Sequence, residues 1–74
     1  MERIVVDPKI LTGKPVINGT RIPAYLVLNL LAEGKSIADI LQEYPELTKE
    51  DVVATLTYAS KLAKYETKQL EASR

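Results

Sequence analysis

Residues 13–23 read Gly-Lys-Pro-Val-Ile-Asn-Gly-Thr-Arg-Ile-Pro, with an Asn-Gly dipeptide between two short segments at residues 16–17 and 21–22. Asn-Gly is the strongest short-range signal for a two-residue hairpin turn, because both of its residues tolerate positive φ angles. The stretch, which we call the arm, therefore predicts a small β-hairpin. The arm ends at Pro23, a residue suited to the first turn of a helix, so we expect it to lead directly into a helical body.

The segment before the arm is expected to contribute one brief strand. Residues 3–6 are a short β-branched run, and Asp7-Pro8 closes it, because proline holds its predecessor extended and interrupts a β-ladder. Between residues 8 and 32 the chain carries no acid and three basic residues, which are Lys9, Lys14 and Arg21. Scattered exposed basic residues are ordinary. The arm is thus either a solvated surface or a grip for phosphate or for the carboxylates of a partner.

Residues 24–33 are rich in Leu and Ala and stop at Gly34, which predicts a helix. At about 100° per residue, the expected core side holds Ala24, Val27, Leu28 and Leu31. Tyr25 and Leu26 fall far from that side, and a helix that is apolar around most of its circumference must be covered. We expect a symmetric homodimer with Tyr25, Leu26 and Leu30 in its interface. The alternative is that the N-terminal strands fold back over Tyr25 and Leu26.

Two further helices are indicated by capping signals. Ser36 is a good N-cap for a short helix that ends near Pro45. Thr48 caps the next helix, with Asp51 three residues on as in a capping box. The predicted core stripe of this third helix consists of Val52, Leu56, Ala59 and Ala63.

The far side of the third helix is predicted to carry Ala54, Tyr58, Lys61 and Tyr65. Tyrosines at such positions either cover the edge of the core or form a contact surface. Tyr58 and Tyr65 are accordingly further candidates for the dimer interface. From Glu66 onward apolar residues become sparse, and we expect the helix to fray into a polar tail.

The two later helices are also compatible with a helix-turn-helix, in which the third helix would enter the major groove of DNA. Lys49 and Lys61 are the candidate DNA contacts. Acidic residues surround the leading end of that helix, at positions 46, 50 and 51, and they would repel a polyanion.

Composition excludes several function classes. The 74 residues hold ten basic and ten acidic side chains, which cancel, and neither cysteine nor histidine. The commonest metal ligand and acid-base group are therefore missing, and the carboxylates show no paired spacing, so we expect no enzyme, catalytic residue, metal or cofactor. No apolar run approaches the roughly 20 residues that span a bilayer, and the chain does not open on a signal sequence. A cytoplasmic protein without membrane contact is expected.

Beyond these local signals, several strings of the chain resemble a bacterial family known as domain of unknown function 433. They are Asp7-Pro8, residues 12–23, Leu31-Ala32-Glu33-Gly34 and Tyr44-Pro45-Glu46-Leu47-Thr48. The similar region runs from about Ile4 to Ala59.

The resemblance implies a homeodomain-like helical fold with an N-terminal β element, and a role as the antitoxin of a two-gene type II toxin–antitoxin system whose toxin resembles a PIN-type nuclease. The family's motif then maps partner binding onto Lys14, Asn18 and Arg21. Two alternatives stay open: a free-standing helix-turn-helix DNA-binding regulator and a non-catalytic oligomerisation module.

The resulting prediction is a single, mainly α-helical domain. Residues 1–22 are expected to form the strand and hairpin, residues 23–65 a three-helix body, and residues 66–74 the frayed tail.

Overall fold

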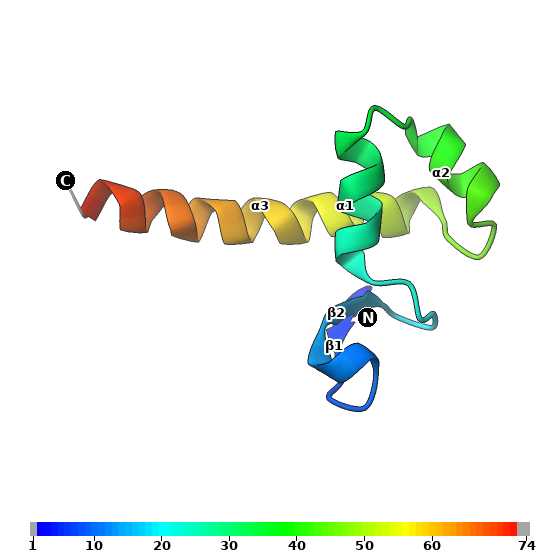
Figure 1. Ribbon diagram of the computed structural model, residues 1–74, viewed down its shortest axis with the longest axis horizontal. Helices are drawn as coiled ribbons and strands as arrows, with labels where there is room; N and C mark the ends of the chain where they lie inside the picture. The colour runs from blue at the N-terminus through cyan, green and yellow to red at the C-terminus, as the bar shows by residue number, and fades with distance from the viewer. Residues whose placement is uncertain (1, 73–74) are drawn as a thin grey trace.

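The computed structural model describes residues 2–72, and the side chains of residues 2–64. Two short strands and a 3₁₀ turn precede three helices (Figure 1). In chain order the elements are β1 (Ile4–Val6), η1 (Leu11–Gly13), β2 (Pro15–Ile17), α1 (Ala24–Ala32), α2 (Ile37–Glu43) and α3 (Lys49–Ala72). The predicted mainly helical fold with a short N-terminal β element is confirmed.

The two-stranded sheet pairs β1 with β2 in antiparallel register, with Val5 opposite Val16. The Asn-Gly turn also forms, but the predicted second strand of its hairpin does not. After the turn, residues 21–23 pair with β2 through an isolated bridge between Val16 and Pro23 and through the Ile17 amide, which donates to the Ile22 carbonyl at 2.9 Å. Proline cannot donate to a ladder, and Ile22 turns into the core. The strand partner of β2 is therefore β1.

Helix α1 ends in a Schellman motif. Gly34 takes a φ of +95°, its amide donates to the Leu31 carbonyl, and the Lys35 amide donates to the Leu30 carbonyl, both at 3.0 Å. Glycine adopts this left-handed conformation without steric cost. The boundary predicted at Gly34 is thus confirmed.

The buried face of α1 is rotated from the predicted one. Ala24, Val27 and Leu30 are buried, whereas Leu28 and Leu31 are half-buried. Leu30 belongs to the core cluster of this chain, so its assignment to a dimer interface is corrected. Leu26 is half-buried and packs against the same cluster.

Reciprocal capping boxes open both later helices. The Asp39 amide donates to Ser36 Oγ and the Ser36 amide donates to Asp39 Oδ2, each at 3.0 Å. The predicted box at α3 is confirmed, because the Thr48 amide donates to Asp51 Oδ2 at 2.9 Å and the Asp51 amide to Thr48 Oγ1 at 3.2 Å. These side chains satisfy amides that the first turn leaves without helical partners.

The buried face of α3 corrects the predicted core stripe. Val52 and Thr55 are fully buried, whereas Leu56 is 43% exposed and Ala63 lies on the surface. Helix α1 and strand β1 pack against α3 on the side of Val52 and Thr55. Thr55 tolerates burial because its hydroxyl donates to the Asp51 carbonyl at 2.9 Å.

Helix α3 continues to Ala72, where fraying from Glu66 was expected. Neither Gly nor Pro occurs in residues 49–74, and Lys, Glu, Ala, Leu and Gln are strong helix formers, so propensity carries the helix past the core. Its C-terminal half extends clear of the other elements and gives the molecule a long dimension of 44 Å (Figure 1). Within the described residues, no helix combines the length and apolar character needed to span a membrane.

Candidate functional site

The arm is held rigid around its Asn-Gly turn. The Thr20 amide donates to the Ile17 carbonyl at 3.0 Å, and Thr20 Oγ1 donates to the same carbonyl at 2.8 Å while accepting the Ile22 amide at 3.0 Å. Gly19 has a φ of +84°, but Asn18 does not take a positive φ. The turn thus resembles type II, with glycine at its third position, rather than a turn with two positive φ angles.

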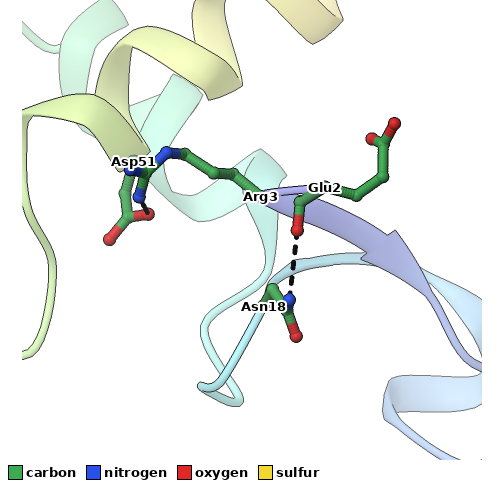
Figure 2. A pocket seen from close by; sticks show the side chains of 4 residues that line it. All are labelled: Glu2, Arg3, Asn18 and Asp51. Atoms are coloured by element: carbon green, nitrogen blue, oxygen red, sulfur yellow. Dashed lines mark hydrogen bonds and ion pairs between the residues drawn. The ribbon is translucent and has the colours of Figure 1, made fainter.

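Asn18 fastens this turn to the start of the chain. Its backbone amide donates to the Arg3 carbonyl at 2.7 Å, and its side-chain Nδ2 donates to the Glu2 carbonyl at 3.1 Å (Figure 2). The structure therefore gives Asn18 an internal role. Its predicted contact with a partner stays a prediction.

Arg21 is the exposed cation of the arm. It lies between Thr20, which carries the turn's hydrogen bonds, and Ile22, which is buried in the core. Among the residues whose side chains are described, the ion pair joins Arg3 and Asp51, and the Arg21 guanidinium takes no part in it. A backbone held by the hydrogen bonds of Thr20 thus presents the charge of Arg21 to solvent.

Lys14 connects the arm to α1. Its Nζ lies 5.4 Å from the centre of the Tyr25 ring, within range of a cation–π contact. Tyr25 is 53% exposed and lies on the surface beside this second cation. Of the two apolar residues expected to need covering on α1, Leu26 is covered internally and Tyr25 is not.

The loop before β2 adds a feature that the sequence did not signal. Leu11 and Thr12 have φ angles of +52° and +54°, although neither is Gly, Asn or Asp. Such a conformation costs roughly 1–2 kcal/mol per residue. The turn leaves Leu11 partly exposed, and the Leu11 carbonyl accepts the Lys14 amide at 3.2 Å. An apolar side chain is therefore held beside the basic arm.

A hollow of about 260 Å³ lies between the arm and α3, lined by Glu2, Arg3, Asn18 and Asp51 (Figure 2). Arg3 reaches across it and donates to Asp51 Oδ1 at 3.0 Å. Burial raises the pKa of Asp51, but hydrogen bonds from the Thr48 amide, Arg3 and the Thr48 hydroxyl outweigh burial, and the pKa is lowered overall. The carboxylate is thus a structural anion and stays charged near neutral pH.

The remaining predicted residues do not gather into one site. Tyr58 is half-buried and lines a second hollow with Glu2 and Arg3. Lys49 and Lys61 are both exposed, and twelve residues along a helix separate them by about 18 Å. The side chain of Tyr65 lies outside the described residues. Within the described part of the chain, no group of three or more acidic residues could hold a metal ion.

These features define a small, mainly helical domain that carries a rigid basic arm on an N-terminal β element. The chain belongs to the family described as "Protein of unknown function (DUF433)", whose sequence pattern matches residues 4–59. The resemblance noted from the sequence is therefore confirmed.

The proteins similar to this chain include two relatives and a solved structure. The uncharacterized protein y4eO of Sinorhizobium fredii is 38% identical over 58 residues, which cover 78% of this chain and 26% of y4eO. An uncharacterized protein of Archaeoglobus fulgidus is 74% identical over 23 residues, 31% of this chain and 64% of that protein. The crystal structure of a DUF433 member protein from Anabaena variabilis matches with a TM-score of 0.80 and 25% identity, covering 96% of this chain and 70% of that one. The chain thus spans less than two thirds of either relative's length.

Proposed function

We propose that this chain is the antitoxin of a type II toxin–antitoxin pair, a non-catalytic protein that binds a PIN-like nuclease through its arm and acts as a homodimer. The family resemblance supplies the class of partner. The observation that carries the proposal is Arg21, an exposed cation with no partner among the described side chains, mounted on a turn with little freedom to move.

The chemistry of the two surfaces is complementary. A PIN-type nuclease holds its metal ions with clustered carboxylates, and a guanidinium binds carboxylates through charge-assisted, often bidentate hydrogen bonds. Because the turn at Thr20 already fixes the backbone, less conformational freedom is lost when Arg21 is immobilised. Lys14 adds a second cation on the same arm, and the Tyr25 ring of α1 beside it adds an aromatic surface.

The proposal predicts that a charge reversal at Arg21 prevents capture of the nuclease. The test is co-expression of this chain with the product of the adjacent gene, scoring both rescue from toxicity and co-purification. We expect Arg21→Glu to weaken the complex by about 30-fold or more, because a carboxylate would face the nuclease's own carboxylates.

Lys35→Glu is the matched control, since Lys35 is an exposed cation just beyond α1, outside the arm. The control should co-purify like the unmodified chain. Equal capture by Arg21→Glu and the unmodified chain would refute binding through the arm, and the absence of any complex with the unmodified chain would refute the nuclease partner.

A further inference from the structure

An apolar stripe on α3 faces away from the core. Val53 and Leu56 are 45% and 43% exposed, and Ser60 continues the same line on the surface. The intervals of three and then four residues are those of the a and d positions in a coiled coil. Large apolar side chains at such positions are expected to pack against another helix.

The flank of this stripe carries a symmetric pattern of charge. Glu50, Thr57 and Lys64 occur at intervals of seven residues, so they share one side of the helix. Glu50 and Lys64 are exposed, and neither forms an ion pair among the described side chains. The acid thus lies seven residues before Thr57 and the base seven residues after it.

We infer that α3 pairs antiparallel with α3 of a second copy along Val53, Leu56 and Ser60, with Glu50 of each copy beside Lys64 of the other. This inference rests on the self-association included in the proposed function and is independent of the nuclease. It replaces the predicted tyrosine interface of α3 with a different face of the same helix.

The charge pattern selects a second copy and its orientation. A twofold axis near Thr57 brings Glu50 of each copy beside Lys64 of the other copy. The surface is therefore complementary to itself, as a symmetric dimer requires. In a parallel pair the flank that holds Glu50 and Lys64 would instead face the opposite flank of the partner helix, so these two residues would not meet. Val53, Leu56 and Ser60 are exposed, so no described element of this chain covers the face that the second helix would contact, and the C-terminal half of α3 extends clear of the body (Figure 1).

The test is a charge exchange followed by sedimentation equilibrium of the isolated chain. Glu50→Lys and Lys64→Glu each create two like-charge contacts in the dimer, and each should raise its dissociation constant about tenfold. The double variant should recover the dissociation constant of the unmodified chain. An equimolar mixture of the two single variants should form a mixed dimer, because each copy then supplies the charges that the other lacks.

Lys61→Glu is the control, since it makes the same charge change on α3 outside the stripe and its flank. Lys61→Glu should leave the dissociation constant of the dimer unchanged. About 1 M salt should remove the differences between the variants, because the screening length for exposed charges then falls to roughly 3 Å. Circular dichroism verifies that each variant is folded.

Three results would overturn the inference: an unmodified chain that stays monomeric at millimolar concentration, single variants that dimerise like the unmodified chain, or a double variant that fails to recover. Each of these leaves capture of the nuclease through Arg21 untouched. Loss of that capture would likewise leave the pairing of α3 untouched.

Discussion

At the scale of single residues, the carboxylate of Asp51 links the first strand to the third helix. One oxygen caps the Thr48 amide, and the other accepts from Arg3, which lies just before β1. Asp51 is only 8% exposed, so water cannot easily replace these contacts. The ion pair with the half-exposed Arg3 is partly screened, and the cap is the more secure contribution.

Asp51→Asn is therefore predicted to lower the free energy of unfolding at pH 7 by about 1–2 kcal/mol. The pKa of Asp51 in the folded chain lies below its ordinary value of 3.8, so its stabilisation is complete above pH 3.8 and is lost as the pH falls through the folded pKa. Urea unfolding at pH 7, 5 and 3 should show the difference between variant and unmodified chain narrowing only at the lowest pH.

The pKa of Asp39 is lowered too, chiefly by the hydrogen bond from the Ser36 amide. Asp39 is present in both Asp51→Asn and the unmodified chain, so its effect cancels in the difference between their free energies of unfolding. A difference that stays constant from pH 7 to pH 3 would contradict the assignment to the Asp51 charge.

The sequence was informative about these residues where the interaction is local. The box of Thr48 and Asp51 spans three residues, and the turn at Asn18-Gly19 is encoded by its own dipeptide. The contact of Arg3 with Asp51 joins residues 48 positions apart, and no local pattern announces it. The sequence likewise identified Arg21 as a cation of the arm, but not the Thr20 hydrogen bonds that fix its backbone.

At the scale of elements, α3 shows how tertiary contacts override an apolar pattern. The run of apolar residues at 52, 56, 59 and 63 favoured one stripe, yet the body packs on the side of Val52 and Thr55. A threonine whose hydroxyl is satisfied within the helix can be buried, whereas Leu56 points away from any element of its own chain that could cover it. Periodicity located the helix correctly but assigned its buried face incorrectly.

This correction predicts unequal effects of two substitutions. Val52→Ala removes methyl groups from a fully buried site and should lower the free energy of unfolding by about 2 kcal/mol. Leu56→Ala should change it by less than about 0.5 kcal/mol when measured below the concentration of self-association. Chemical unfolding of both variants at low micromolar concentration tests this prediction. A larger loss of unfolding free energy for Leu56→Ala than for Val52→Ala would support the buried stripe inferred from the sequence.

At the scale of the whole molecule, the distribution of charge bears on DNA binding. Ten basic residues are offset by ten acidic ones, and on α3 Lys49 sits beside Glu50 with Lys61 a third of a turn around the helix. Phosphate contacts require several cations on one face, each of which releases counterions from the duplex. The described surface of α3 does not gather them.

The chain alone is accordingly predicted not to retard duplex DNA in a gel-shift assay at about 150 mM salt, and any binding at about 20 mM salt should fall steeply as salt is added. Lys49→Ala and Lys61→Ala should then behave alike, because neither would contact a base. Binding of one DNA sequence in strong preference to others at the higher salt would instead favour the helix-turn-helix regulator, provided that Lys49→Ala abolishes this binding. The leading end of α3 would then have to meet DNA despite the charge of Glu50, while the ion pair with Arg3 partly offsets the negative charge of Asp51.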